Sequence, residues 1–330
     1  MKSSWLGIAL TYVGAVVGAG FASGQEIYQF FGRYGANGLL GIALAGILFG
    51  VLGYLALERG RKYGVTKFGD LLKTAYPPWV VRLAEGVTTA FLFIGLGVVS
   101  AGGGAAAFQL AGLPILAGAA LTTAAIILVV ALGRDSVVRA NSVLMPYLIC
   151  LVVLVALLTW SHAAVPRTAV GGPRWVLSAL LYLSYNIFTG IMVLLGVGPS
   201  LRTSRDSLWA AGVGAIILSG LAALEHHALV RAPSLGALPM MDIASRIHGT
   251  WGGLYGLSLW VALFTTGIAE AYALKVQFGN RILWVLTGTF LFGFLGFANL
   301  VASLYPVMGV VAVLLWIPLI NRREHRVPGG

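Results

Sequence analysis

Charged residues are scarce in this chain: only 9% of its 330 residues are Asp, Glu, Lys or Arg, whereas 59% are hydrophobic. Soluble domains carry about 25% charged residues, so this composition excludes a water-soluble globule of this length. A single cysteine, Cys150, excludes an intrachain disulfide framework and any metal site built from several cysteines. The composition therefore indicates an integral membrane protein in a lipid bilayer.

Long apolar runs dominate the chain instead. A membrane-spanning helix needs about 20 mostly apolar residues, and ten ranges meet this requirement. They are 5–31, 36–57, 84–110, 114–133, 140–160, 175–198, 207–230, 251–275, 281–297 and 300–320. The last two are separated by a poorly marked turn near residues 296–299. We predict an all-α polytopic membrane protein with ten transmembrane helices.

Basic residues are distributed unevenly between the two sides of these ten spans. With the amino terminus in the cytoplasm, five of the 21 basic residues lie outside, namely Arg33, Arg167, Arg174, Arg231 and Arg246. All the others fall in cytoplasmic segments, as the positive-inside rule requires. We therefore expect both termini in the cytoplasm. The net charge of +11 is then a rim that sets orientation, and no nucleic-acid partner is needed to explain it.

The range 5–31 contains a segment that is a poor continuous helix. Between residues 14 and 26 it holds four glycines and three polar side chains: Gly14, Gly18, Gly20, Gly24, Ser23, Gln25 and Glu26. Each glycine costs about 1 kcal/mol relative to alanine inside a helix. One interpretation is a close-packing glycine face, which Gly14 and Gly18 alone would satisfy. The added polar residues favour a discontinuous helix, which membranes tolerate only inside protein or beside a water-filled cavity.

A second weak point lies five spans later, where Asn186, Thr189 and Gly190 interrupt the range 175–198. Interrupted helices at corresponding positions of two halves indicate the binding site of a transporter. Because each half would hold five spans, the second half must insert with inverted topology. We predict a 5+5 inverted repeat with broken helices 1 and 6, formed by residues 1–160 and 161–330 within one transmembrane domain.

Adjacent threonines, Thr265 and Thr266, lie in the range 251–275. They could bond back to carbonyls one turn earlier, as helical threonines often do. Alternatively, their hydroxyls could bind a hard cation such as Na⁺, which prefers oxygen ligands.

Glu26 and Glu270 are the carboxylates that we place inside spans. An ionisable residue at membrane depth indicates a functional site, because burial is costly without a partner or water. Glu26 could bind a substrate amine, take up a proton or close a gate, or it could pair with Arg33. Glu270 could line the pathway as a gate or proton relay, or it could pair with Lys2 or Lys275.

Glu225, His226 and His227 form a possible metal cluster at the end of the range 207–230. Adjacent residues on a helix diverge by about 100°, so the two histidines cannot readily share one ion. We therefore do not predict a metal site here.

Two loops carry an amphipathic helical pattern. The first is formed by Phe68, Leu71, Leu72 and Ala75, and the second by Met240, Ile243, Ala244 and Ile247. Either helix could lie on the bilayer surface or cap a pathway through the membrane.

Together these features resemble a known family. The break at 14–26, the weak point at 186–190 and the threonine pair at 265–266 resemble the leucine-transporter fold of the amino acid–polyamine–organocation superfamily. More closely, Gly-Ala-Gly-Phe-Ala-Ser-Gly-Gln-Glu at 18–26 and Ser-Tyr-Asn at 184–186 resemble the YkvI-like family of bacterial membrane proteins. The resemblance implies a location in the bacterial inner membrane.

The resemblance also implies a site, carried over position by position. One Na⁺ would be bound by the carbonyls of Gly14 and Val17 and by the hydroxyls of Thr265 and Thr266. No organic cofactor is implied. Some proton-coupled relatives place a lysine at this site from the fifth helix, but the range 140–160 contains none. Phe21 stands where a second sodium site would need an asparagine, so one site is implied.

The solute would lie between the two breaks. Freed N–H groups of Gly18, Ala19 and Gly20 favour a carboxylate, and Glu26 would bind an amine. Hydrogen-bonding or packing groups would come from the other break, namely Tyr185, Asn186 and Thr189.

We predict a secondary active transporter, working by alternating access, that couples Na⁺ to the symport of a small amino-acid-like or organic-amine solute, and not an enzyme. Three alternatives stay open: a proton-coupled transporter using Glu26 or Glu270, a membrane ligand sensor without transport, and an intramembrane enzyme using the two carboxylates. The sequence does not determine an oligomeric state.

Overall fold

The computed structural model describes residues 4–64, 69, 72–73, 76–132, 135–160, 171–232 and 234–320, without the side chains of 135–146 and 314–320. These residues are mostly helical and contain no strand, which confirms the all-α prediction. The helices of the first half are α1 (Trp5–Val16), α2 (Ala19–Ala22), α3 (Gln25–Phe30), η1 (Gly32–Tyr34), α4 (Ala36–Tyr63), α6 (Pro78–Ala111), α7 (Ile115–Leu132) and α8 (Asp135–Leu158). Those of the second half are α9 (Arg174–Val197), η2 (Gly198–Ser200), α10 (Ser204–Leu229), α11 (Pro239–Ile247), α12 (Gly249–Phe278), α13 (Ile282–Leu286), η3 (Thr287–Phe294) and α14 (Phe297–Ile320).

Helices occupy all ten ranges predicted from the sequence. By length and composition, six described helices can cross a membrane, namely α4, α6, α7, α9, α10 and α12. A seventh span results if residues 282–294 and 297–313 count as one, although they are bent by 111°. The bend falls at Gly296, whose φ of 77° is accessible to glycine at little cost. Length alone therefore supports six or seven spans, and the count of ten is not established by it.

The first span is discontinuous, as predicted. Helix α1 ends at Val16, the single turn α2 follows, and α3 begins at Gln25. Gly18 is extended (φ −100°, ψ −176°), and Gly24 adopts the left-handed conformation with φ 77°. A side chain at Gly24 would be strained and would also collide with Met240. The glycines thus set the positions at which this span breaks.

The sixth span is not broken, and this prediction was wrong. Helix α9 continues from Arg174 to Val197. The side chain of Asn186 donates a hydrogen bond to the carbonyl of Tyr182 at 3.2 Å, and the Thr189 hydroxyl donates to the carbonyl of Asn186 at 2.8 Å. Gly190 gives room to the ring of Tyr12, which a β-carbon would approach to 2.9 Å. Both polar side chains therefore bond within the helix, with the Thr189 hydroxyl also 3.3 Å from the carbonyl of Ala15 in α1, and the glycine serves packing.

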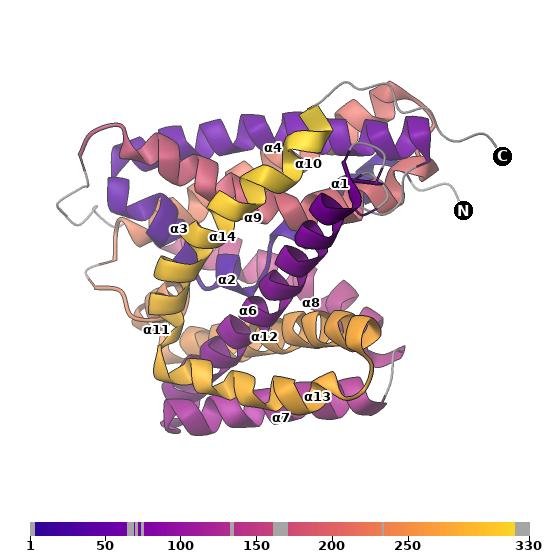
Figure 1. The fold of residues 1–330 in the computed structure, drawn as a ribbon. Helices are drawn as coiled ribbons and strands as arrows, with labels where there is room; N and C mark the ends of the chain where they lie inside the picture. The colour runs from indigo at the N-terminus through magenta and orange to yellow at the C-terminus, as the bar shows by residue number, and fades with distance from the viewer. Residues whose placement is uncertain are drawn as a thin grey trace.

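The helices form two layers. Figure 1 shows α4, α9 and α10 in one layer and α7, α12 and α13 in the other, with α6 and α14 crossing between them. Helix α1 packs against α9 and α10, whereas α2 contacts α12. The broken first span therefore leads from one layer to the other, and its break lies where they meet.

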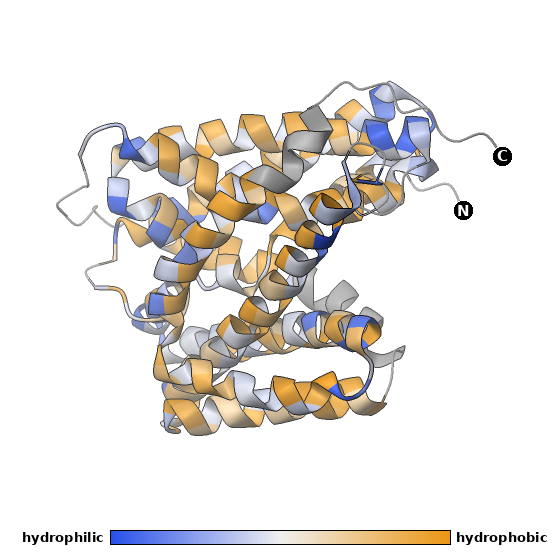
Figure 2. Ribbon diagram, viewed as in Figure 1, coloured by the Kyte–Doolittle hydropathy of each residue, from blue (hydrophilic) through white to orange (hydrophobic). Residues whose placement is uncertain are grey.

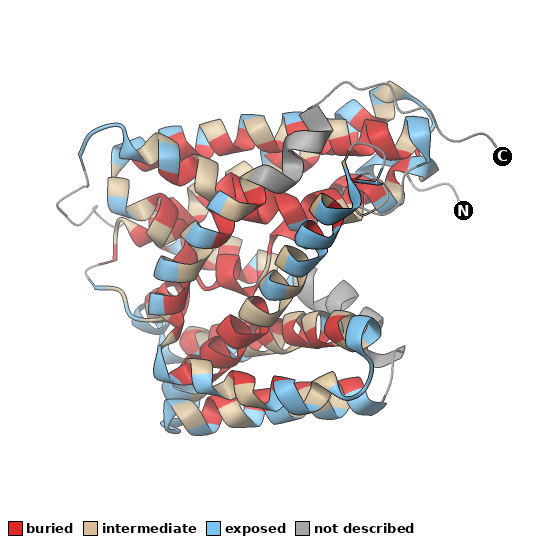
Figure 3. Ribbon diagram, viewed as in Figure 1, coloured by how far each residue is buried: buried red, intermediate tan, exposed pale blue. Residues whose placement is uncertain are grey.

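The outer surface of both layers is apolar. Figure 2 shows hydrophobic residues along the length of the helices, with hydrophilic residues gathered mainly at their ends. Large exposed side chains include Leu132 and Trp284, which are each 81% exposed, and Ile216. Figure 3 shows that the buried residues lie where the helices face one another. This distribution suits a protein whose surface faces lipid.

One of the two amphipathic patterns can be compared with the structure. Met240, Ile243, Ala244 and Ile247 lie on α11, as predicted, and the first three are buried against the protein. The N–H of Met240 donates to the carbonyl of Ser23 at 3.0 Å, so α11 covers the break of the first span. Of the other pattern, Phe68, Leu71 and Ala75 lie outside the described residues.

Candidate functional site

A cavity of about 190 Å³ lies between the broken first span, α6, α9, α12 and α14. It brings together residues from distant parts of the chain. All seven predicted solute-binding residues line it: Gly18, Ala19, Gly20, Glu26, Tyr185, Asn186 and Thr189. Thr266 and Glu270 of α12 line it as well.

Glu26 is positioned by the break. The turn at Gly24 starts α3, which places the Glu26 side chain in the cavity although the residue is only 5% exposed. Its Oε2 accepts a hydrogen bond from the Tyr185 hydroxyl at 2.5 Å. Gly20 leaves room for the carboxylate, because a β-carbon there would overlap Oε1. Tyr185 therefore holds the Glu26 carboxylate in place, and the proposed pairing with Arg33 is not what positions it.

The Glu270 carboxylate lies on the side of the cavity formed by α6 and α12, where a glycine again leaves room for it. A β-carbon at Gly95 of α6 would overlap its carboxylate. Its Oε2 is buried and has no hydrogen-bond partner among the described residues. Lys275, a proposed partner, instead donates to the carbonyl of Val130 at 2.8 Å, and Lys2 lies outside the described residues. Gly95 therefore accommodates a carboxylate that no described side chain neutralises.

Tyr305 is a lining residue that the sequence reasoning missed. It lies on α14, and its ring centroid is 4.8 Å from that of Tyr185. It shares the lining of the cavity with both Glu26 and Glu270. A lone tyrosine in an apolar span resembles ordinary core packing, so the only sequence signal was its polar hydroxyl at membrane depth.

The four residues of the predicted cation site are gathered only in part. Thr266 lines the cavity, whereas Thr265 is buried and donates to the carbonyl of Ala262 at 3.1 Å. Val17 has left the helical conformation, with φ −73° and ψ 95°. Gly14 is exposed, with open space beside it. The bond made by Thr265 is the back-bonding expected of a helical threonine.

Glu225 is a third carboxylate inside a span, and our placement of only two was incomplete. It lies within α10, is completely buried, and neither of its oxygens has a hydrogen-bond partner in the described part of the chain. The predicted range 207–230 already contained Glu225, and α10 ends at Leu229.

The histidines that follow Glu225 point to different neighbours. His226 packs against Gly38 of α4, where a β-carbon would come within 2.6 Å of its ring. The ring of His227 stacks on Trp160, with centroids 4.2 Å apart. Within the described ranges, no three His, Cys, Asp or Glu side chains are grouped to hold a metal ion.

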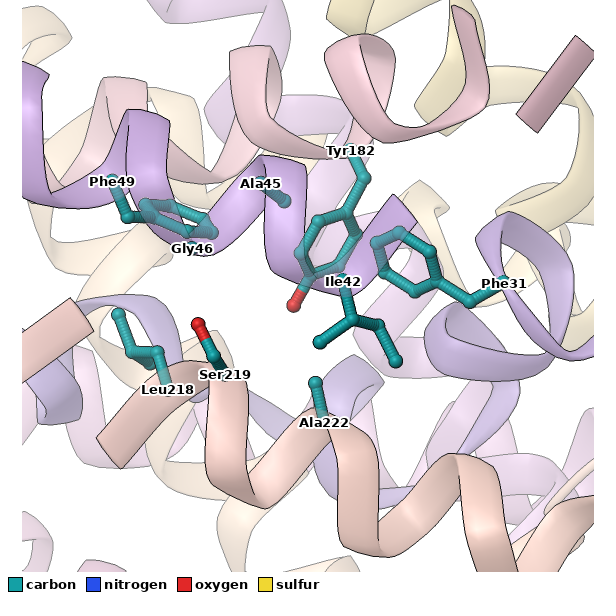
Figure 4. Close-up of a pocket in the computed structure, with 9 residues that line it drawn as sticks. All are labelled: Phe31, Ile42, Ala45, Gly46, Phe49, Tyr182, Leu218, Ser219 and Ala222. Carbon is teal, nitrogen blue, oxygen red and sulfur yellow. The ribbon is translucent and has the colours of Figure 1, made fainter. Parts of the chain in front are cut away.

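Two other hollows lie away from the carboxylates. Figure 4 shows the hydroxyl of Tyr182 pointing into a pocket between α4, α9 and α10. Its volume of about 10 Å³ is that of a single water molecule, so it cannot hold a solute. The second, of about 530 Å³, adjoins the ends of α10 and α11 and is lined by Arg231, Arg246 and mainly apolar residues.

The chain resembles uncharacterised proteins over nearly its whole length. It is 26% identical to the uncharacterised protein YyaD of Bacillus subtilis (strain 168), and the match covers 94% of each chain. It is 24% identical to the uncharacterised membrane protein YkvI of the same organism, and this match covers 98% of each. The predicted resemblance to YkvI-like proteins is therefore confirmed. No protein-family model matches the chain.

Solved structures show the fold. A crystal structure of MhsT in complex with L-phenylalanine has a TM-score of 0.61 at 19% identity, covering 97% of this chain and 88% of MhsT. The inward-facing conformation of Mhp1 has a TM-score of 0.68 at 13% identity, covering 97% of this chain and 76% of Mhp1. A mutant of the Eremococcus coleocola manganese transporter has a TM-score of 0.60 at 15% identity, covering 97% of this chain and 78% of the transporter. The chain thus has the leucine-transporter fold.

Proposed function

We propose that this protein is a secondary active transporter that works by alternating access and symports Na⁺ with a small amino-acid-like or organic-amine solute. The proteins of similar fold are secondary transporters, so transport is the function class that the fold favours, and an enzyme is disfavoured. We place the protein in the bacterial inner membrane with both termini in the cytoplasm.

The cavity beside the broken span is the observation that carries this proposal. It holds two carboxylates, and no Lys or Arg is among the described residues that line it. A solute amine would bind Glu26, which Tyr185 holds in place. A solute carboxylate would accept hydrogen bonds from the backbone N–H groups of Gly18, Ala19 and Gly20. Asn186 and Thr189 would bind other polar groups of the solute.

Sodium coupling would use the carbonyls of Gly14 and Val17 and the hydroxyls of Thr265 and Thr266. The Thr265 hydroxyl donates its proton to Ala262, which leaves its oxygen lone pairs available to a cation. Na⁺ would join α1 to α12 and so stabilise one facing state over the other. A ligand shifts such an equilibrium only by its difference in affinity between the two states.

Proton coupling is a second candidate, and Glu270 favours it. Its unpartnered Oε2 beside the cavity could carry a proton in one state and lose it in the other. The residues that distinguish the two candidates, Thr266 and Glu270, lie one turn apart on α12.

Uptake into proteoliposomes tests the proposal. With Na⁺ coupling, uptake requires a Na⁺ gradient and is lost in Thr266→Val, while Thr11→Val on the exposed face of α1 behaves as wild type. Uptake that ignores Na⁺ but fails in Glu270→Gln would replace sodium with proton coupling. Ligand binding without flux would instead indicate a sensor, and chemical conversion of the ligand an enzyme.

A further inference from the structure

The two carboxylates of the cavity come from different helices. Glu26 lies on α3 of the broken span, and Glu270 lies on α12. The described lining contains no Lys, Arg or His that could neutralise either of them. Two ionised carboxylates in one enclosed space repel each other, and each is costly to bury without a cation or a proton. A ligand with a positive charge at each of the two places would neutralise both.

Each carboxylate is seated in a notch made by a glycine. A β-carbon at Gly20 would overlap Oε1 of Glu26, and a β-carbon at Gly95 would overlap Oε1 and the carboxyl carbon of Glu270. The first notch is in the broken span and the second is in α6. Each carboxylate therefore occupies a space that exists because the facing residue is a glycine.

Two tyrosines lie beside the carboxylates in the cavity. The Tyr185 hydroxyl donates to Glu26, the Tyr185 ring packs on that of Tyr305, and Tyr305 lines the same cavity as Glu26 and Glu270. Glu26 therefore has a hydrogen-bond donor, whereas Oε2 of Glu270 has none among the described residues. A ligand that reached only Glu26 would leave Glu270 unpaired.

We propose that the solute carries two positively charged groups, one bound by Glu26 and the other by Glu270, as in a linear alkyl diamine. This inference rests on the proposed function, which makes the cavity the solute site. The cavity of about 190 Å³ has room for at least about six water-sized groups, and a four-carbon diamine has six non-hydrogen atoms. Phe91 and Phe188, whose rings are 5.7 Å apart, line the cavity and offer apolar and aromatic faces to the alkyl chain and to its ammonium groups.

Binding to the purified full-length protein tests this proposal without any transport measurement. We expect 1,4-diaminobutane to bind at least tenfold more tightly than butylamine, which has the same chain and a single amine. A series of diamines should show an optimum chain length, because both carboxylates are fixed. Equal binding of the diamine and the monoamine, or tighter binding of a zwitterionic amino acid, would overturn the proposal.

Variants locate the two contacts. Glu270→Gln should reduce the preference for the diamine to near unity while butylamine still binds, and Glu26→Gln should weaken both amines. Glu85→Gln, which changes an exposed glutamate of α6, is the matched control and should keep the preference. A preference that survives Glu270→Gln would overturn the proposal, and the wild-type comparison stands even if a variant fails to fold.

The outcomes separate this inference from the proposed function. Diamine binding without flux in proteoliposomes would refute transport and leave the dicationic ligand standing. Flux of a monoamine or an amino acid, with no preference for the diamine, would refute the dicationic ligand and leave transport standing.

Discussion

The Tyr185 hydroxyl donates a 2.5 Å hydrogen bond to the Glu26 carboxylate, and this bond joins α9 to the broken first span. Both residues are at least 90% buried and both line the cavity. The bond ties the most polar part of the break to a continuous helix, so the position of Glu26 depends on an element 159 residues away.

Tyr185→Phe should weaken the binding of an amine ligand by about 10- to 100-fold. A hydrogen bond to a charged group contributes about 1.5–3 kcal/mol, and here it also orients the carboxylate. The measurement is the dissociation constant by calorimetry, with Tyr147→Phe on the exposed part of α8 as the control. Unchanged affinity in Tyr185→Phe would mean that Glu26 is positioned by other contacts.

Gly95→Ala should displace the Glu270 carboxylate and reduce ligand binding, because the added β-carbon would overlap it. Gly86→Ala on the same helix has no atom within 4 Å of the added carbon. It should leave binding intact and stabilise α6 by up to about 1 kcal/mol, since alanine is the better helix former. Thermal unfolding and calorimetry measure the two effects. Similar behaviour of both variants would show that the notch at Gly95 has no role.

Glu225→Met should stabilise the fold by about 1–3 kcal/mol, because it removes a buried carboxyl without a hydrogen-bond partner and keeps a similar shape. Glu58→Met is the matched contrast. Glu58 accepts hydrogen bonds from Arg61, Ser204 and Ser207 at 2.8–2.9 Å, so its replacement should destabilise the protein. Thermal unfolding in one detergent compares the two. A destabilised Glu225→Met would indicate that Glu225 has a partner in solution.

Asp242 gives a pH dependence outside the membrane-spanning helices. Burial raises its pKa above the ordinary 3.8, although hydrogen bonds from Gly236 and Gln109 oppose the shift. The folded state therefore binds this proton more tightly than the unfolded state, so the contribution of Asp242 to stability falls as pH rises from about 3.8 through the raised pKa. The melting temperature of the wild type relative to Asp242→Asn should fall across this window. A difference that is constant or rises with pH would contradict the shift.

Much of the fold was readable from the sequence. Apolar runs located helices at all ten predicted ranges. A helix pairs its own backbone N–H and C=O groups, so an apolar helix can face either lipid or protein. The glycines at 18 and 24 located the break of the first span, since only glycine adopts the left-handed conformation found at Gly24 without strain. All seven predicted solute-binding residues line one cavity. Whether they bind a solute is a prediction.

Only the tertiary structure decided the features that depend on neighbours from other helices. The polar residues of α9 suggested a break, but Asn186 and Thr189 bond within their own helix, and no single-helix pattern separates these outcomes. The burial of Glu225 and the notch of Gly95 for Glu270 depend on which helices face each other. Local conformation is encoded by adjacent residues, whereas the environment of a buried charge is made by residues far away in the chain.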